Sequence, residues 1–312
     1  MHKTYLLGVD AGGTHTVCLL ADDTQHILGR GEAGPANMVA VGLDAAAAAV
    51  REAVAQAWRA AGMAPRPAAV ACIGMSGAGL LQDRQALARA LSPYGLAQRV
   101  VIVSDALIAL AAGSPSAVGV VVIAGTGAIA WGRNRAGEER RASGWGYILG
   151  DEGSAFDIGL AALRAVTRAH DGRGQPTMLT ELILEHWRLS QPEDLRSIVY
   201  STPSYPRPEV AALAPIVEQA ARQGDMAALD IYARAAEELA LAAKAVIGSL
   251  GMQAEPVDIV LSGGVYNAGD LIVEPFLRAV REVAPRAQAI RLEQEPAMGA
   301  VHLAAQGSAG MA

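Results

Sequence analysis

The chain has 312 residues, a formal net charge of −6 and no run of lysine or arginine. This length exceeds that of most single domains, so we expect two domains with a small-molecule site in the cleft between them. The acidic balance excludes a surface that follows nucleic-acid phosphates, and we expect no nucleic-acid partner. Glycine and proline turns break the uncharged stretch 106–132 into runs too short to span a bilayer, so we expect no membrane partner.

The first half of the chain begins with three short strands and continues as alternating helices and strands. We expect strands at 5–9, 15–21, 25–30, 68–75 and 99–104, and helices at 43–61, 81–91 and 106–112. The segment "GSPS" at 113–116 then marks the passage into a second domain.

The same plan starts again after this passage. We expect strands at 119–124, 128–133, 139–142, 257–262 and 288–293, a mainly helical stretch at 153–248, and helices at 269–283 and 297–305. The helical stretch is interrupted by a proline-rich loop at 201–209. Each half therefore reads βββαβαβα, with a helical insertion in the second. This pattern predicts a duplicated α/β architecture with domains 1–115 and 116–296, and a C-terminal helix within 297–312 that packs back near the first domain.

The two cysteines, Cys18 and Cys72, indicate a reducing compartment. Both lie inside apolar, strand-like runs rather than in paired motifs, which is typical of buried free thiols. The residues before Asp10 lack the apolar core of a signal peptide. We therefore expect a cytoplasmic location.

Two strand–turn–strand segments, "GVDAGGTHT" at 8–16 and "IAGTGAIA" at 123–130, carry the most specific local chemistry. Successive backbone N–H groups in a glycine turn form an anion-binding concavity, so one turn in each domain could hold a polyphosphate from both sides. A Walker-type loop is excluded, because the only lysines are Lys3 and Lys244. "GTGAIA" runs into a strand rather than a helix, which argues against a dinucleotide fold, and "GMSGA" at 74–78 misses the nucleophile elbow of hydrolases.

Five ordered motifs support a family resemblance: "GVDAGGTHT", "SDA" at 104–106, "AGTGAIA", "GWGYILGDEGSA" at 144–155 and "LSGGVYNAG" at 261–269. Over almost the entire chain they resemble the N-acetylglucosamine kinases and BadF-BadG-BcrA-BcrD-type ATPases of the actin-like ATPase and sugar kinase superfamily. The resemblance implies duplicated ribonuclease H-like domains and a kinase that uses ATP and Mg²⁺ to phosphorylate the 6-hydroxyl of an amino sugar. N-acetylglucosamine is the leading substrate, and glucosamine and N-acetylmuramic acid stay open.

The resemblance also implies a nucleotide site. Asp10 would organise Mg²⁺ through water, although an aspartate before two glycines is equally typical of a plain turn. The phosphates would be contacted by Gly12, Gly13, Thr14, Gly125, Thr126 and Gly127, and the adenosine by Gly263, Gly264, Val265, Tyr266 and Asn267.

On the sugar side, the resemblance makes Asp105 the catalytic base, and helix capping is the structural alternative for this residue. The predicted sugar contacts are Asn37, Asp105, Gly127, Ala128, Ile129, Gly144, Trp145, Gly146, Tyr147 and Asp151, with Ser76 and Gly77 bordering the pocket. Tyr147 could instead be a core aromatic. Neighbouring side chains point in different directions, so we assign Asp151 to sugar hydroxyls and Glu152 to the start of the following helix or a nearby backbone N–H.

Two other functions stay open. Related proteins activate 2-hydroxyacyl-CoA dehydratases through an iron–sulfur cluster between subunits, which requires exposed cysteines. A sugar sensor without catalysis would lack the base at position 105. The resemblance also makes a homodimer possible, because dimers are common in the family. The six histidines show no metal-ligand spacing, so we expect no structural metal site.

Overall fold

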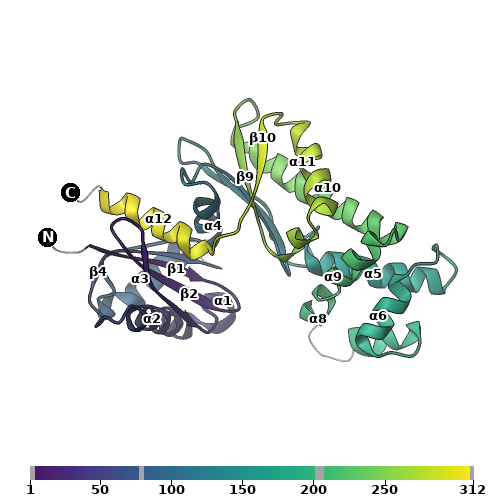
Figure 1. Ribbon diagram of the computed structural model, residues 1–312, viewed down its shortest axis with the longest axis horizontal. Coiled ribbons are helices and arrows are strands. Elements are labelled where there is room, and N and C mark those ends of the chain that lie inside the picture. Colours follow the sequence, from purple (N-terminus) through teal and green to yellow (C-terminus); the bar gives the residue numbers. More distant parts are fainter. Residues whose placement is uncertain (1–3, 77–80, 201–206, 310–312) are drawn as a thin grey trace. The chain divides into compact units, whose positions relative to one another are not determined.

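The computed structural model describes residues 4–76, 81–200 and 207–309. The chain divides into two compact units, which Figure 1 shows in the colours of the sequence. Unit 1 comprises Met1–Gly119 and Leu292–Ala312, and unit 2 comprises Val120–Arg291. Each unit is built around its own five-stranded sheet.

The sheet of unit 1 has the strand order β3-β2-β1-β4-β5. Its strands are β1 (Tyr5–Ala11), β2 (Thr16–Asp22), β3 (Ile27–Ala33), β4 (Ala68–Met75) and β5 (Ala97–Ser104). The first three strands are antiparallel neighbours, whereas β1, β4 and β5 run parallel. The carboxyl ends of β1, β4 and β5 therefore meet at one edge, where Asp10 pairs with Gly74 of β4.

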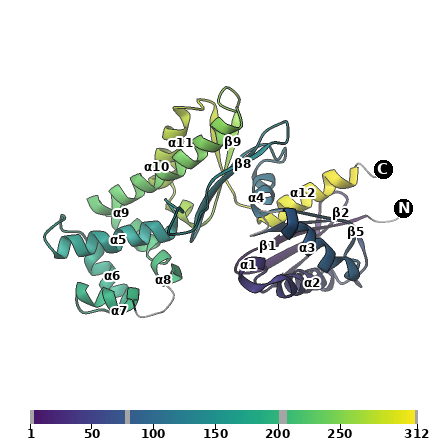
Figure 2. The ribbon, with the colours of Figure 1, turned by 180° about the vertical axis from the view of Figure 1, so that it is seen from behind.

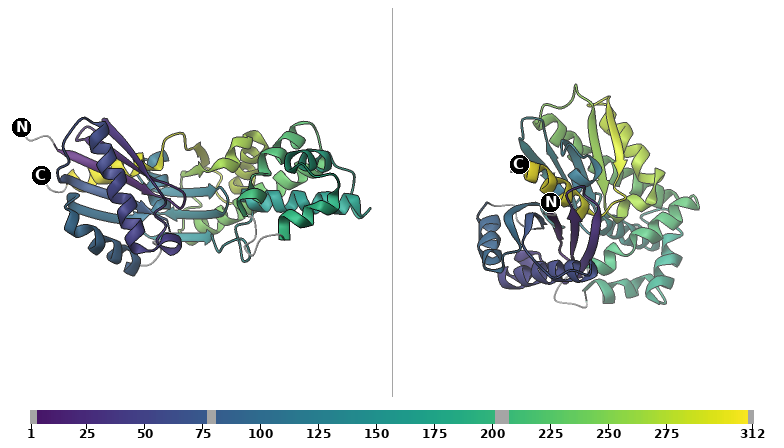
Figure 3. Two further views of the ribbon diagram at one scale, coloured as in Figure 1. Left: turned by 90° about the horizontal axis from the view of Figure 1, so that it is seen from below. Right: turned by 60° about the vertical axis from the view of Figure 1, so that its left-hand side comes forward.

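Helices cover both faces of this sheet, so its central strands read as nearly continuous apolar runs. The helices of unit 1 are α1 (Met38–Val41), α2 (Leu43–Ala60), α3 (Leu81–Leu91), the 3-10 helix η1 (Ser92–Tyr94), α4 (Asp105–Gly113) and α12 (Pro296–Ala309). Trp58 of α2 packs on the face that carries Leu7 and Leu20. Ile108 of α4 and Val301 of α12 pack on the opposite face, and Figures 1 and 3 show the yellow helix α12 against the purple strands.

Glycine allows α12 to approach its neighbours closely. A Cβ atom on Gly8 of β1 would lie 2.4 Å from the carbonyl oxygen of Ala297, and one on Gly299 would lie 1.9 Å from that of Ile108. Both distances are far below any real Cβ contact, so these positions require glycine. The result is that the beginning of α12 packs directly on β1 at Gly8 and on α4 at Ile108.

The sheet of unit 2 has the strand order β10-β9-β6-β7-β8. Its strands are β6 (Gly119–Ala124), β7 (Ala128–Arg133), β8 (Glu139–Ser143), β9 (Val257–Ser262) and β10 (Ala287–Arg291). Its helices are α5 (Ala155–His170), α6 (Leu179–Trp187), α7 (Leu195–Tyr200), α8 (Arg207–Ala211), α9 (Ala214–Arg222), α10 (Met226–Ser249) and α11 (Asp270–Arg281), with the 3-10 helices η2 (Pro192–Asp194) and η3 (Gly264–Ala268). Figure 2 shows α10 and α11 alongside the sheet, and the helices α5 to α9 form the insertion.

Two mixed sheets flanked by helices confirm the predicted duplicated α/β fold with a helical insertion in the second half. The proline-rich loop expected at 201–209 is wrong in its last part, because residues 207–209 begin α8. Its first part, 201–206, lies outside the described residues. Within the described parts of the chain, no helix combines the length and the apolar character needed to cross a membrane.

Candidate active site

The glycine turn of unit 1 follows Asp10 directly. The Gly12 N–H donates to the carbonyl of His15 at 3.1 Å, which closes the turn between β1 and β2. The Gly12 carbonyl accepts from the N–H of Ala36 at 2.9 Å, so the turn is joined to the loop that carries Asn37. A Cβ atom on Gly13 would meet nothing within 4 Å. The turn thus offers bare backbone with open space above it.

A chain of hydrogen bonds connects three of the predicted sugar-site residues of unit 1. The Asn37 Nδ2 donates to Ser76 Oγ at 3.3 Å, and the Ser76 hydroxyl is hydrogen-bonded to the carboxylate of Asp105. The N–H of Ser76 donates to the carbonyl of Ala11 at 3.1 Å, which places this chain beside the end of β1. Gly77, also predicted to border the sugar pocket, lies outside the described residues.

Asp105 is the first residue of α4, but it does not cap the helix. The hydroxyl of Ser104 accepts from the N–H of Leu107 at 3.2 Å and is the N-cap. The Asp105 carboxylate accepts from the neighbouring N–H of Ala106 at 2.9 Å and keeps its remaining acceptor capacity. Ser104 therefore holds the N-cap position, and the Asp105 carboxylate adds a hydrogen bond to another N–H of the first helical turn.

Carboxylates are crowded at this edge of the sheet. Burial, the charge of Asp105 and the charge of Glu295 together raise the pKa of Asp10 from 3.8 to about 7. Burial also raises the pKa of Asp105, partly offset by the hydrogen bonds from Ala106 and Ser76. Glu295, just before α12, is held by Arg30, whose Nε and Nη2 lie 3.0 and 2.8 Å from Oε1 of Glu295. The sequence analysis missed Glu295, because this residue is far from β1 in sequence and lies in none of the motifs.

The glycine turn of unit 2 lies between β6 and β7. The Gly125 N–H donates to the carbonyl of Gly127 at 2.9 Å, and the Gly125 carbonyl accepts from the N–H of Ala155 at 2.8 Å. These bonds tie the turn, with Thr126 at its centre, to the first residue of α5. A Cβ atom on Gly125 would meet nothing within 4 Å, so this turn also exposes bare backbone.

Asp151 lies directly against this turn. A Cβ atom on Gly127 would lie 2.6 Å from Oδ2 of Asp151. The carboxylate accepts from the N–H groups of Gly146, at 3.3 Å, and of Ala128. Asp151 also has a positive φ of 62°, a backbone conformation that costs free energy in residues other than glycine. Burial raises the pKa of this carboxyl above its ordinary value, and the two N–H groups oppose the increase.

Glu152 does not cap the N-terminus of α5. Ser154 is the N-cap and accepts from the N–H of Asp157 at 3.2 Å, while the Asp157 carboxylate accepts from the N–H of Gly153 at 3.0 Å. Glu152 instead accepts from the hydroxyl of Ser143 at 3.5 Å. Within the described residues, Glu152 therefore has neither of its two predicted roles, which were the helix start and a bond to a nearby backbone N–H.

The two aromatic residues of the predicted sugar segment differ in exposure. Trp145 is 64% exposed and stacks under the guanidinium of Arg141. Tyr147 packs edge-on against Phe156, with ring centroids 5.4 Å apart, and its ring also lies 4.6 Å from the guanidinium carbon of Arg207. Tyr147 thus combines core packing with a polar neighbour that the sequence did not identify.

The remaining glycines of this segment follow β8. Gly144 has a φ of 70°, and its Cβ position lies 2.8 Å from Cδ1 of Ile129, another predicted sugar contact. Gly146 has a φ of 85° and open space around its Cβ position. Of the predicted sugar residues of unit 2, the structure places Gly127, Ala128 and Gly146 directly against the Asp151 carboxylate.

The predicted adenosine segment begins after β9. Gly263 has a φ of 108°, and its Cβ position lies 2.3 Å from the carbonyl oxygen of Ala124, so this backbone closely approaches the glycine turn of unit 2. Gly264 has open space at its Cβ position. The side chains of Val265 and Tyr266 are buried, so only their backbone is available to a ligand. The Asn267 side chain accepts from Arg291 at 2.5 Å.

These residues fit the implied ATP and Mg²⁺. The space above Gly13 and Gly125 is what close approach of phosphate to backbone requires. Carboxylate oxygens such as those of Asp10 are the ligands that Mg²⁺ prefers. Among the described residues, no three acidic, histidine or cysteine side chains converge closely enough to hold a metal directly.

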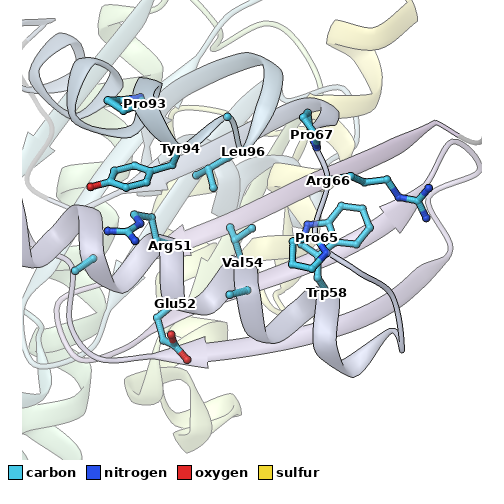
Figure 4. Close-up of a pocket in the computed structure, with 13 residues that line it drawn as sticks. Arg51, Glu52, Val54, Trp58, Pro65, Arg66, Pro67, Pro93, Tyr94 and Leu96 are labelled. Atoms are coloured by element: carbon cyan, nitrogen blue, oxygen red, sulfur yellow. The ribbon is translucent and has the colours of Figure 1, made fainter.

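A groove of about 790 Å³ lies elsewhere on unit 1, beside α2 and the segments 65–67 and 93–96 (Figure 4). The guanidinium carbon of Arg51 lies 3.6 Å from the centre of the Tyr94 ring at one end of it. None of the predicted site residues lines this groove. The candidate site is therefore defined by the glycine turns and carboxylates and not by this groove.

Two α/β units built on one strand plan, each with a bare glycine turn after its first strand, define the class of actin-like ATPases and sugar kinases. The chain belongs to the BadF/BadG/BcrA/BcrD ATPase family, which residues 7–304 match. The predicted family and its duplicated fold are therefore confirmed.

Three similar proteins extend this finding. An N-acetylmuramic acid/N-acetylglucosamine kinase of Clostridium acetobutylicum is 32% identical over 300 residues, covering 96% of this chain and 98% of that protein. An N-acetyl-D-glucosamine kinase of Dictyostelium discoideum is 32% identical over 314 residues, covering 97% and 98%. The crystal structure of a Chromobacterium violaceum protein provisionally assigned as an N-acetylglucosamine kinase is 28% identical, with a TM-score of 0.76 and coverage of 97% and 99%.

Proposed function

We propose that this protein is an ATP-dependent kinase that phosphorylates the 6-hydroxyl of an amino sugar, with N-acetylglucosamine as the leading substrate. The observation that carries the proposal is the hydrogen-bond chain from Asn37 through Ser76 to Asp105, at the edge of the sheet that also holds Asp10. Full-length similarity to proteins named as amino-sugar kinases supports it.

In the proposed reaction, Asp105 accepts the proton of the sugar hydroxyl while the bond from that oxygen to the γ-phosphorus forms. The bond between the γ-phosphorus and the oxygen bridging to the β-phosphate breaks, and ADP leaves with that electron pair. Phosphoryl transfer depends mainly on positioning and charge stabilisation, so a weakly basic carboxylate suffices. Asp151 accepts hydrogen bonds from other sugar hydroxyls and so orients the ring.

Phosphate binding is assigned to Gly12, Gly13 and Thr14 in unit 1 and to Gly125, Thr126 and Gly127 in unit 2. Mg²⁺, held through water by Asp10, supplies charge neutralisation for the phosphates when it is bound. The adenosine is assigned to residues 263–267. A cytoplasmic location and a homodimer complete the proposal.

The two cysteines do not support the alternative function of a dehydratase activator, which requires exposed cysteine ligands. Cys18 and Cys72 are both buried, and burial raises the pKa of each thiol far above its ordinary value. Neither can reach an intersubunit cluster without rearrangement of the sheet of unit 1. An iron assay on protein purified without oxygen distinguishes the two functions.

The experiment that tests the proposal measures ADP release against a panel of hexoses and amino sugars, with Asp105→Asn as the control. We expect N-acetylglucosamine to stimulate ADP release in the natural protein and not in the variant. If no sugar stimulates release, or if the variant keeps full activity, the proposed function is wrong.

A further inference from the structure

Arg207 is placed at the sugar segment by close packing of two helices. A Cβ atom on Gly159 of α5 would lie 2.0 Å from the carbonyl oxygen of Val210 in α8. Only glycine at this position lets α8 lie so close to α5. Because Arg207 is the first residue of α8, this contact fixes its backbone next to the segment 144–155.

The Arg207 side chain extends from there to two predicted sugar contacts. Its guanidinium carbon lies 4.6 Å from the centre of the Tyr147 ring, and its Nη2 lies 3.9 Å from Oδ2 of Asp151. The ring holds the planar guanidinium in a defined orientation. The nitrogen–oxygen distance is longer than a hydrogen bond, so Asp151 leaves the donors of this guanidinium largely unused.

The environment of Arg207 differs from that of a solvated surface arginine. Its side chain is 38% exposed, yet its Nε is buried and has no hydrogen-bond partner among the described residues. A buried donor without a partner costs free energy. The carboxylate of Asp151 meanwhile accepts from the N–H groups of Gly146 and Ala128, and so has partners that do not depend on Arg207.

A cation with unused donors beside a sugar site suits an anionic substrate group. A neutral sugar offers hydroxyls, for which the Asp151 carboxylate is the natural acceptor. A carboxylate attached to the ring offers two oxygens that match the fork of a guanidinium. The 3.9 Å between Nη2 of Arg207 and Oδ2 of Asp151 is short enough for one sugar to contact both side chains.

We propose that Arg207 is a specificity-determining residue, and that it lets this active site accept an amino sugar carrying a carboxylate by pairing with that group while Asp151 binds neighbouring hydroxyls. This inference rests on the proposed kinase function and adds the residue that would recognise the carboxylate of an acidic amino sugar. N-acetylmuramic acid is a suitable probe, because it differs from N-acetylglucosamine by a carboxylate-bearing ether substituent.

The test compares the two sugars in the full-length protein and three variants. Arg207→Gln removes the charge, Arg207→Lys keeps a charge without the planar fork, and Arg168→Gln changes an exposed arginine near the far end of α5 as a matched control. The measurements are kcat/KM from ADP release, and binding of each sugar by calorimetry without nucleotide. Melting temperatures identify any variant that fails to fold.

We expect the natural protein to bind and phosphorylate both sugars. Arg207→Gln should lower kcat/KM and affinity for N-acetylmuramic acid by about 10- to 100-fold, with little change for N-acetylglucosamine. Arg207→Lys should recover part of this loss, and Arg168→Gln should resemble the natural protein.

Two results overturn the inference. In one, the natural protein uses N-acetylglucosamine but neither binds nor phosphorylates N-acetylmuramic acid. In the other, Arg207→Gln loses both sugars equally, which shows that Arg207 only orients Asp151. If no sugar is phosphorylated at all, the proposed function fails, and the calorimetric comparison still decides whether Arg207 selects the acidic sugar.

Discussion

Ser104 and Asp105 divide two tasks at the start of α4. The Ser104 hydroxyl caps the helix by accepting from the Leu107 N–H at 3.2 Å. The adjacent Asp105 carboxylate is hydrogen-bonded to Ser76 instead, in line with Asn37. The proposed function therefore gives helix capping to Ser104 and proton acceptance to Asp105, and mutation can separate the two roles.

Replacement of Asp105 by asparagine should reduce kcat without loss of stability. The amide cannot accept the proton of the sugar hydroxyl, and a general base typically contributes about 10²- to 10⁴-fold. The melting temperature should stay the same or rise, because burial opposes the charge of the carboxylate. Steady-state ADP release and thermal unfolding measure the two effects.

Ser104→Ala is the matched control. Loss of the N-cap should lower the free energy of unfolding by about 1 kcal/mol while kcat stays close to that of the natural protein. The division of tasks would be refuted by the reverse pattern, in which Ser104→Ala loses kcat and Asp105→Asn loses stability.

Replacement of Asp10 by asparagine should stabilise the metal-free protein at alkaline pH. The pKa of Asp10 is raised to about 7, so the folded state binds this proton more tightly than the unfolded state does. Its contribution to stability is therefore complete below about pH 4 and is lost as the pH rises to about 7. Asparagine has no such proton, and the variant should gain on the order of 1–3 kcal/mol over the natural protein at about pH 8.

Urea unfolding without Mg²⁺ at about pH 4 and about pH 8 measures this difference. We expect a small difference between the two proteins at the acid pH and a larger one at the alkaline pH. An equal difference at both pH values would mean that burial and the charges of Asp105 and Glu295 do not raise the pKa of Asp10.

Gly127→Ala should impair sugar binding through Asp151. The new Cβ would lie 2.6 Å from Oδ2 of Asp151, so the carboxylate must move away from the N–H groups that hold it. We expect KM for the sugar to rise by about 10-fold or more, since a lost hydrogen bond to a charged group costs about 1.5–3 kcal/mol. Gly34→Ala, where the Cβ meets nothing within 4 Å, is the control and should leave KM unchanged. Equal kinetics in both variants would show that Asp151 does not contact sugar.

Gly263→Ala should impair nucleotide binding. The position has a φ of 108° and a Cβ site only 2.3 Å from the carbonyl of Ala124, so alanine must displace the backbone next to the glycine turn of unit 2. We expect KM for ATP to rise more than KM for the sugar, with a loss of stability of about 1–3 kcal/mol. A variant with normal KM for ATP would remove residues 263–267 from the proposed adenosine site.

The sequence predicted the elements well because their hydrophobic periods are strong. The apolar run of β6 ends at a glycine turn, which marks the end of the strand. The apolar residues of 226–249 recur with an uninterrupted helical period, and this segment forms α10. Helix caps were less certain. The rule that favours Ser or Asp at an N-cap fits both Ser104 and Asp105, and only backbone geometry selects Ser104.

Residues that act across long sequence separations could not be predicted. Glu295 reaches the neighbourhood of Asp10 only because Gly8 and Gly299 let α12 pack tightly on β1 and α4. Arg207 lies in a proline-rich stretch that is typical of a loop, and its proximity to Asp151 depends on the contact of Gly159 with Val210. In both cases the only sequence signal is a glycine inside a strand or helix. Such a glycine indicates that another element packs closely there, but it does not identify that element.

The proposed kinase reaction requires that the glycine turns at 12–14 and 125–127 bind the same nucleotide. A crystal structure with a non-hydrolysable ATP analogue, Mg²⁺ and N-acetylglucosamine tests it most directly. We predict backbone N–H groups of both turns at about 2.7–3.2 Å from oxygens of one triphosphate, with the sugar 6-hydroxyl next to Asp105. A triphosphate held by one turn alone, with the other turn in solvent, would contradict the account.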